Sequence, residues 1–376
     1  ATELIVPFQY VQRFLILVHL LALFTACGDD PADWRLPPES VPATTAVPAT
    51  PAAAIAALME STIRDQQLVG LQVSIARTNG EIWSLSAGTA DLGRKETLSS
   101  EHLFRIGSLT KTFTATIIMR LVQEGRLSLD APVSTWIRGY PGLERVTIRN
   151  LLGHTSGIQN VFSIPDVFVN STLFPDKFWN HKWLAMECCE SGPEFQPGTR
   201  TAYSNTNYIL LGIIIETVTG RRMAEHYHEL AEGVWFVPYE ARPASLVSGH
   251  VDHFVTMERW YEHKPDTKSW ATAGFTAGAL ASSAKAIVRF GQRLFSSEII
   301  PEDQLNQMRS FRERYGLGFI RYETGGYSLY GHEGELTGFT AVMLFDEPSG
   351  LILAACCNTT PFDSVALLGQ IRRLLP

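Results

Sequence analysis

The chain has 376 residues, of which 45% are hydrophobic and 18% are charged, and its formal net charge is −7. This length and composition are typical of a globular protein with a large core, built as one domain or as two closely joined lobes. The balance of 31 basic against 38 acidic residues argues against nucleic acid as a partner, because nucleic-acid-binding surfaces are rich in Lys and Arg.

The first residues have the layout of an export signal. Arg13 precedes the apolar run FLILVHLLALFTA at 14–26, which is too short to span a bilayer comfortably. Two small residues stand directly before Cys27, as at a bacterial lipoprotein processing site. We therefore expect residues 1–27 to direct export, with Cys27 lipidated and the protein anchored to a bacterial membrane, in the periplasm or at the cell surface. A plain secretory signal and an uncleaved N-terminal anchor are the alternatives.

A tether is predicted between this signal and the folded body. Residues 28–54 are rich in Pro, Ala and Thr and show no apolar periodicity, so they cannot bury enough surface to fold. The folded body is expected over 55–376. It begins with an amphipathic helix around 52–67, followed by the β-rich runs LQVSIAR and EIWSLSAG, which are separated by the turn TNG and form a hairpin.

The C-terminal part is a second source of strands. The runs YGLGFIRYET, YSLYGHEG, FTAVMLFDE and LILAACCN are broken by turns, and a helical tail follows. A helix and hairpin at the start and a β-meander and helix at the end predict one antiparallel sheet assembled from both chain ends. The expected α+β fold has an α/β lobe at about 55–105 and 270–376, and a mainly helical lobe at about 106–269.

The cysteines and histidines do not predict a metal site. Four of the five cysteines form two adjacent pairs, Cys188, Cys189, Cys356 and Cys357. In an exported protein these four permit three disulfide patterns, and the apolar run around the second pair favours buried free thiols there. Neither pair has the spacing of a zinc site, and His226 and His228 point to different faces of a helix. No metal or organic cofactor is expected.

The clearest chemistry lies in FRIGSLTKTFTATIIMRLVQEGRLSLD at 104–130. Ser108 stands at the start of a helix, where unpaired N–H groups favour negative charge. Lys111 follows one turn later on the same face. A serine hydroxyl is a weak nucleophile until a neighbour takes its proton, and a buried lysine can do this as a neutral amine. The alternative is a helix-capping serine beside a solvated lysine.

In the run 195–220, a second polar group, Tyr203-Ser204-Asn205, stands in a loop ahead of a strongly apolar helix. Tyr203 can act as a base only if a nearby cation stabilises its phenolate, and Lys111 is the obvious candidate. Asn205 offers both a donor and an acceptor, which suits it to orient a lysine and to hold a substrate amide. Alternatively, the asparagine marks a helix start and the tyrosine fills the core.

The run GHEGELTG at 331–338 places His332 before two glutamates, Glu333 and Glu335. By itself this pattern fits a metal site, an acid–base pair or the start of a strand.

Taken in order, S-x-x-K in IGSLTK, Y-x-N in YSN, and a basic residue with glycine in GHEG resemble one serine hydrolase family. This family joins class C β-lactamases, D-alanyl-D-alanine carboxypeptidases and related esterases. The stretches VTIRNLLGHTSGI, FQPGTRTAYSN, AGALASSAKAIVRFGQRL and YGLGF resemble it too, so the likeness covers about 55–375. It implies a β-lactamase/transpeptidase-like fold and catalysis without a metal or organic cofactor.

Carried over to this chain, the resemblance implies that Ser108 is the acylated nucleophile. Lys111 and Tyr203 would share the proton transfer, while Asn205 would contact both the substrate and Lys111. The acyl-enzyme would form as a leaving group departs, and water would then release the acid. His154 in GHTSGI is interpreted as part of a structural loop beside the cleft rather than as a member of a Ser-His-Asp triad.

The same resemblance assigns roles to the GHEG segment. The backbone N–H groups of Ser108 and Glu335 would form the oxyanion hole. Gly334 would allow close approach of backbone to ligand, and His332 would face the substrate. Glu333 stands where the family commonly has Thr or Ser, and inside the pocket it would repel a substrate carboxylate. A glutamate that points to solvent is the alternative.

The predicted function is therefore hydrolysis of ester or amide substrates, either peptide-like or β-lactam-like. One alternative is a D-alanyl-D-alanine carboxypeptidase or β-lactamase that acts on cell-wall-like substrates. Another is a penicillin-binding sensor that is acylated but does not turn over, and a third is a metallohydrolase built on His332 and Glu333.

Overall fold

The computed structural model describes residues 50–376 with the exception of 94, 238, 242, 252–260 and 264–267. The expected export segment, with Cys27, and most of the expected tether lie outside the described residues. In the part of the chain that is described, none of the helices combines the length and the apolar character needed to cross a bilayer.

The first described helix, α2 (Pro51–Gln66), begins inside the segment that the sequence assigned to the tether. Its start follows from local chemistry, because the Thr50 side chain accepts a hydrogen bond from the Ala53 N–H and proline stands in the first turn. The helix ends at Gln67, whose φ of 57° is left-handed. The helix expected around 52–67 is thereby confirmed, and its first turn overlaps the end of the expected tether.

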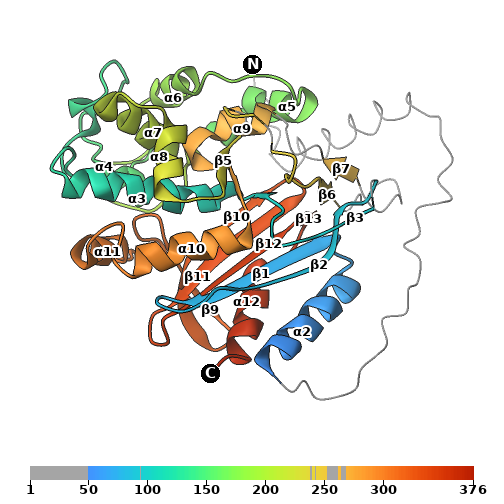
Figure 1. Cartoon of the computed structure of the whole chain (residues 1–376). Coiled ribbons are helices and arrows are strands. Elements are labelled where there is room, and N and C mark those ends of the chain that lie inside the picture. Colours follow the sequence, from blue (N-terminus) through green and yellow to red (C-terminus); the bar gives the residue numbers. More distant parts are fainter. Residues whose placement is uncertain (1–49, 94, 238, 242, 252–260, 264–267) are drawn as a thin grey trace, which may run out of the picture. The chain divides into compact units, whose positions relative to one another are not determined.

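The central sheet has seven strands in the order β3-β2-β1-β12-β11-β10-β9 (Figure 1). The N-terminal strands are β1 (Gly70–Arg77), β2 (Trp83–Asp91) and β3 (Glu96–Thr97). The C-terminal strands are β9 (Ile320–Thr324), β10 (Tyr327–Leu336), β11 (Phe339–Asp346) and β12 (Leu351–Cys357). Because β1 pairs antiparallel with β12, both ends of the chain build one sheet, and this confirms the prediction from sequence.

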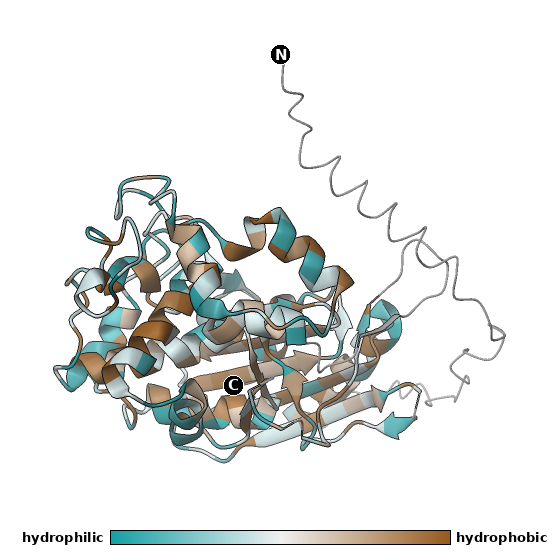
Figure 2. Ribbon diagram, turned by 90° about the horizontal axis from the view of Figure 1, so that it is seen from above, coloured by the Kyte–Doolittle hydropathy of each residue, from teal (hydrophilic) through white to brown (hydrophobic). Residues whose placement is uncertain are grey.

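Both faces of this sheet are covered. Strand β11 sends Met343 to the face beneath α10 (Ala284–Phe295), whereas its neighbour Val342 packs on the other face with α2 and α12 (Ser364–Arg373). Alternation of side chains along a strand produces these two layers. Figure 2 shows the central strands coloured largely as hydrophobic, while the surrounding helices carry both hydrophobic and hydrophilic residues.

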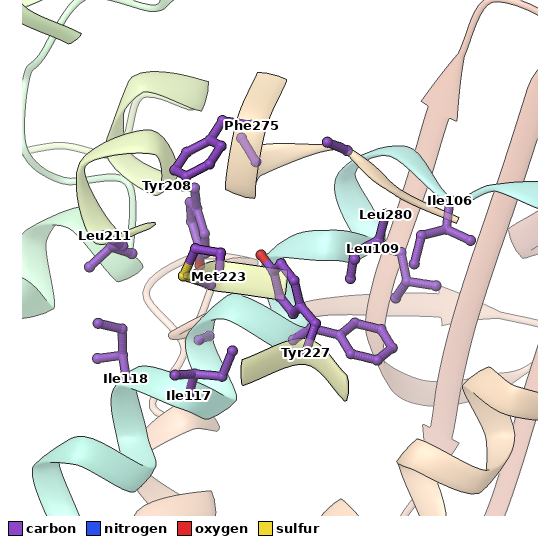
Figure 3. Close-up of a cluster of buried hydrophobic side chains, with 14 of the residues drawn as sticks. Ile106, Leu109, Ile117, Ile118, Tyr208, Leu211, Met223, Tyr227, Phe275 and Leu280 are labelled. Atoms are coloured by element: carbon purple, nitrogen blue, oxygen red, sulfur yellow. The ribbon is translucent and has the colours of Figure 1, made fainter. Parts of the chain in front are cut away.

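The region between the two sets of strands is mainly helical. Its helices are α3 (Thr110–Gln123), α4 (Ile148–Leu152), α5 (Pro165–Leu173), α6 (His181–Cys189), α7 (Asn205–Thr219), α8 (Met223–Leu230) and α9 (Lys268–Gly274), and α11 (Glu302–Met308) follows α10. Short 3₁₀ turns are η2 (Gly107–Leu109), η3 (Val133–Thr135), η4 (Val161–Ser163) and η5 (Phe275–Ala277). Helices α3 and α7 bury their apolar sides together with α8 and η5 (Figure 3).

Two small sheets interrupt the helices, which the sequence did not predict. One contains β4 (Phe104–Arg105), β8 (Leu280–Ser282) and β5 (Val234–Phe236). The other contains β13 (Thr359–Thr360), β6 (Gly249–Val251) and β7 (Tyr261–His263). Strands of two or three residues are too short to show a clear alternation of apolar and polar side chains. The β4–β8 pair matters for the site, because it brings the segments before Ser108 and after η5 side by side.

All four cysteines of the folded body are buried free thiols in the structure. Cys356 and Cys357 are neighbours on β12, and strand alternation turns them to opposite faces of the sheet. Burial raises the pKa of Cys188 to about 11 and that of Cys189 to about 12. Such thiols remain protonated and unreactive at neutral pH.

Candidate active site

Ser108 lies in the short turn η2 that leads from β4 into α3. Ile106 and Leu109 on either side of it are fully buried and anchor the turn in the core (Figure 3). Gly107 has a φ of 50°, and a β-carbon there would lie 2.9 Å from the Glu335 nitrogen. Only glycine satisfies both conditions, so the sequence IGS presents the serine hydroxyl on a rigid turn.

Lys111 is completely buried, and its amine contacts three oxygens. Its Nζ lies 2.9 Å from Ser108 Oγ, 2.8 Å from Asn205 Oδ1 and 2.8 Å from the carbonyl oxygen of Ala277. None of these partners is a carboxylate. Burial without a compensating anion therefore holds the pKa of Lys111 well below its usual value.

The three contacts define what a neutral Lys111 does. A neutral amine has two hydrogens and one lone pair. The Asn205 and Ala277 oxygens can only accept, so they take the two hydrogens. The lone pair is left facing the hydroxyl of Ser108, which is the arrangement a general base requires.

Tyr203 lies on the other side of the serine. Its hydroxyl donates to Ser108 Oγ at 2.9 Å, and its ring centroid is 4.8 Å from Lys111 Nζ. The residue is 42% exposed, but desolvation of its hydroxyl raises the pKa of Tyr203, and the hydrogen bond to Ser108 opposes this only in part. Tyr203 therefore stays protonated beside a neutral lysine. The phenolate base that the sequence allowed lacks the cation it would need.

Asn205 is the first residue of α7, and a residue that the sequence missed fixes its orientation. Its backbone N–H and its side-chain Nδ2 both donate to Asn160 Oδ1, at 3.0 and 3.1 Å. These two bonds turn Asn205 Oδ1 towards Lys111. Asn160 stands two residues after the GHTSGI stretch, but nothing in its sequence context indicates this partner.

His154 supports the loop that carries Tyr203. The histidine is fully buried, and its ring centroid lies 4.2 Å from that of Tyr203. Its Nδ1 accepts from the backbone N–H of Ser204 at 3.2 Å. Burial holds the pKa of His154 well below its usual value, so the ring is neutral. The described contacts of His154 include none with Ser108, which fits the interpretation as a structural residue rather than a triad member.

Strand β10 packs its Gly334 directly against the nucleophile turn. A β-carbon at Gly334 would lie 2.0 Å from the Ile106 carbonyl oxygen and 2.6 Å from the Ser108 nitrogen, so no larger residue fits. Hydrogen bonds to β11 alternate from the tight turn at Leu336–Phe339, and the N–H of Glu335 therefore points away from β11. The Ser108 nitrogen lies beside Gly334, and the Glu335 nitrogen lies beside Gly107. The two backbone nitrogens are therefore on segments that pack against each other.

His332 differs from the expectation that it faces the substrate. It is only 1% exposed, and both ring nitrogens are engaged. Nδ1 donates to the Glu333 carbonyl oxygen at 2.5 Å, and so Nε2 must accept from the Tyr315 hydroxyl at 2.9 Å. Burial, with help from Lys111, lowers the pKa of His332 to about 3. A neutral ring in this position offers no positive charge to a substrate carboxylate.

Glu333 points away from the serine. Because Gly334 faces the nucleophile turn, the side chain of its neighbour lies on the opposite face of β10. There it is near Tyr322 and Asp363, the residue that caps α12. Desolvation raises the pKa of Glu333, and a hydrogen bond with Tyr322 opposes that shift. Its negative charge nevertheless contributes to the raised pKa of Tyr203, so the repulsion of a substrate carboxylate by Glu333 stays a prediction.

Of the residues singled out from the sequence, Lys111, Tyr203 and Asn205 thus meet at Ser108. Within the described parts of the chain, no group of three or more His, Cys, Asp or Glu side chains is placed to hold a metal ion. Asn160, the Ala277 carbonyl and Tyr315 also belong to the arrangement. Tyr315 lies in YGLGF and Ala277 begins AGALASSAKAIVRFGQRL, two stretches that the sequence had marked, whereas Asn160 lies in none of them.

Comparisons with known proteins agree with this geometry. The sequence model of the family described as Beta-lactamase matches residues 52–375. Penicillin-binding protein 4 of Amycolatopsis lactamdurans is 24% identical over 312 residues, which cover 74% of this chain and 78% of that protein. Esterase EstB of Burkholderia gladioli is 29% identical over 214 residues, 54% of this chain and 53% of the esterase.

Solved structures give the same result. The D-amino acid amidase from Ochrobactrum anthropi SV3, complexed with L-phenylalanine amide, superposes with a TM-score of 0.75 at 25% identity. The match covers 86% of this chain and 98% of the amidase. A D-stereospecific amidohydrolase from Streptomyces sp. has a TM-score of 0.70 at 26% identity, over 83% of this chain and 97% of that chain.

An antiparallel sheet built from both chain ends, a helical region and a serine at their junction define a serine hydrolase of the β-lactamase type. The chain belongs to the Beta-lactamase family. It shares this family of serine hydrolases with penicillin-binding proteins, esterase EstB and the D-amino acid amidase.

Proposed function

We propose that the protein hydrolyses esters or amides through an acyl-enzyme on Ser108. The observation that carries the proposal is the buried amine of Lys111, 2.9 Å from the serine hydroxyl and without a carboxylate partner among the described residues. A protein gains no stability from burying an unpaired amine, so its placement next to a nucleophile indicates proton transfer.

In the acylation step, Ser108 Oγ attacks the substrate carbonyl carbon while its proton passes to the neutral amine of Lys111. The carbonyl oxygen becomes negatively charged between the backbone N–H groups of Ser108 and Glu335, which stabilise it. When the C–N or C–O bond breaks, the leaving atom takes the proton of Tyr203. The tyrosine recovers a proton from the Lys111 ammonium, so the base is neutral again.

In the second step, water attacks the acyl-serine. Lys111 is neutral once more and accepts a proton from this water through the hydrogen-bonded oxygens of Ser108 and Tyr203. The oxyanion again forms at the two backbone N–H groups, and the acid departs as Ser108 is reprotonated. The chemistry uses only groups of this chain.

We further propose that the substrates lack a carboxylate next to the scissile bond. A neutral His332 bonded to Tyr315 offers no cation for such a group. The names of two relatives, an esterase and a D-amino acid amidase, support this preference. Relatives named penicillin-binding proteins support the alternatives, which are a carboxypeptidase or β-lactamase and a sensor that stays acylated.

Labelling with a fluorophosphonate probe and with fluorescent penicillin tests these possibilities. We expect fluorophosphonate label on the wild type, none on Ser108→Ala, and full label on the control Ser310→Ala, whose serine is exposed. A label that persists in Ser108→Ala would defeat the assignment of the nucleophile. Stable penicillin label would instead favour the sensor, and rapid turnover of penicillin would favour the β-lactamase.

We also propose that the protein is exported and held at a bacterial membrane through a lipid on Cys27. The apolar run 14–26 and the small residues before Cys27 support this. Growth with a clickable fatty acid is expected to label the wild type but not Cys27→Ser. Cys188→Ser, which changes a buried thiol of the folded body, serves as the control and is expected to keep its label. Equal label on both variants would refute the proposal.

A further inference from the structure

Next to Ser108, only a short part of the β10 edge is left without a neighbouring strand and could pair with a substrate. Strand β9 pairs with β10 as far as Ile320 and Gly331, and no strand pairing of β9 continues beyond this point. The alternation of hydrogen bonds along β10 directs the backbone groups of Glu333 and Glu335 to this edge. A substrate whose carbonyl oxygen rests on the Glu335 N–H must lie along it.

At Glu333, both backbone groups on this edge are already occupied. The N–H donates to the Tyr322 hydroxyl at 3.2 Å, and the carbonyl oxygen accepts from His332 Nδ1 at 2.5 Å. Tyr315 in turn bonds the other nitrogen of His332. Tyr322 and Tyr315 are 4% and 8% exposed, so the core holds both phenols in place. Only Glu335 remains to pair with a substrate.

The leaving group of the substrate lies on the side of the edge where the backbone of Glu333 already has hydrogen-bond partners. The leaving atom must reach Tyr203 to collect a proton. The Tyr203 ring is 6.1 Å from that of Tyr315, which bonds His332. The charge of Glu333 contributes to the raised pKa of Tyr203, and Lys111 to the lowered pKa of His332. The proton-transfer groups thus lie towards residues 332–333, and the leaving group extends in that direction.

Building on the proposed hydrolase function, we propose that Tyr322 and His332 close the leaving-group side of the β10 edge. A peptide leaving group running along this edge would have to pair with the backbone of Glu333, whose N–H is already bonded to Tyr322 and whose carbonyl oxygen already accepts from His332. Ammonia from a primary amide, or a short alcohol from an ester, needs no such pairing. The site is therefore selective for small leaving groups over extended peptides.

A series of substrates with one acyl group tests this selectivity. The acyl group is an N-acetylated amino acid, and the leaving group is ammonia, an amino acid amide or a dipeptide amide. For the wild type we expect kcat/KM to fall at least tenfold from the primary amide to the dipeptide amide. Equal values across the series would overturn the proposal without any use of a variant.

Variants of Tyr322 provide the second test. Tyr322→Phe frees the Glu333 N–H, and Tyr322→Leu also opens space beside it. Both are expected to raise the ratio of kcat/KM for the dipeptide amide to that for the primary amide at least fivefold. The matched control is Tyr327→Phe at the start of β10, where the ratio is expected to stay unchanged. If both Tyr322 variants keep the wild-type ratio, the proposed closure is wrong.

The same samples separate this inference from the proposed function. If fluorophosphonate does not label Ser108, the hydrolase proposal itself fails. If Ser108 is labelled and the primary amide is cleaved, but the dipeptide amide is cleaved equally well, only the closure of the edge fails.

Discussion

Two buried basic side chains show how differently this protein treats a buried cation. Arg372 of α12 places its Nε 2.6 Å from Asp346 Oδ2, and both side chains are almost inaccessible to water. Lys111 is buried as deeply, but it contacts only neutral oxygens. The arginine keeps its charge beside an anion and stabilises the fold. The lysine instead loses its proton easily, which suits it for catalysis.

The largest expected effect comes from replacing Lys111, whose buried amine has no anionic partner among the described residues. Lys111→Met should lower kcat/KM by about 1,000-fold, because no other described group lies ready to take the serine proton. Its midpoint of unfolding in urea should stay the same or rise, since an apolar side chain replaces a desolvated amine. Substantial activity in this variant would show that Tyr203 can act as the base alone.

The paired cation should behave in the opposite way. Arg372→Met is expected to lower the free energy of unfolding by about 3 to 5 kcal/mol, because Asp346 is left buried without its partner. Values of kcat/KM measured well below the unfolding temperature should remain near those of the wild type. The double variant Arg372→Met/Asp346→Leu, which removes both charges, should recover most of the loss, and a failure to recover would mean that packing dominates.

A smaller effect is expected from Asn160, which orients the Asn205 side chain that contacts Lys111. Asn160→Ala removes the acceptor that orients Asn205, so kcat/KM should fall about tenfold, equivalent to one hydrogen bond. Asn170→Ala changes a half-buried asparagine of α5 that is not among the residues of the site, and serves as the control. Because Asn160 acts through Lys111, its variant should also shift the pH profile of kcat/KM, which a loss of packing alone would not do.

The contribution of Lys111 to the stability of the fold depends on pH. The folded-state pKa of Lys111 lies well below 10.5, so between these values the unfolded chain binds more protons than the folded chain. Its contribution to stability therefore increases with pH up to about 10.5, by up to about 1.4 kcal/mol per pH unit. The stability difference between wild type and Lys111→Met should show this slope. Activity should also increase with pH as Lys111 becomes neutral.

The smallest effect is expected from Glu333→Thr. Its carboxylate lies on the far face of β10, so kcat/KM should change by less than about twofold for neutral and for carboxylate-bearing substrates alike. A clear gain with carboxylate-bearing substrates would show that the glutamate faces the pocket in solution. It would also bring an anion close enough to matter for Lys111.

Much of the fold could be read from local patterns. Alternating and continuous apolar runs in residues 70–91 and 320–357 predicted the strands, and their position at both ends of the chain predicted one shared sheet. The helix predicted around 52–67 is present as α2, but the two small sheets were not predicted. Strands of two or three residues exist only because of the partner strand.

By itself, the sequence determined which residues are available for catalysis. Ser108 and Lys111 are one helical turn apart, and this spacing alone puts them on the same face. Only the tertiary structure decided their chemical states. Whether Lys111 is charged depends on which oxygens surround it, and whether His332 can meet a substrate depends on Tyr315. Such long-range contacts leave no periodic signal in the chain, because they are made by residues far apart in sequence.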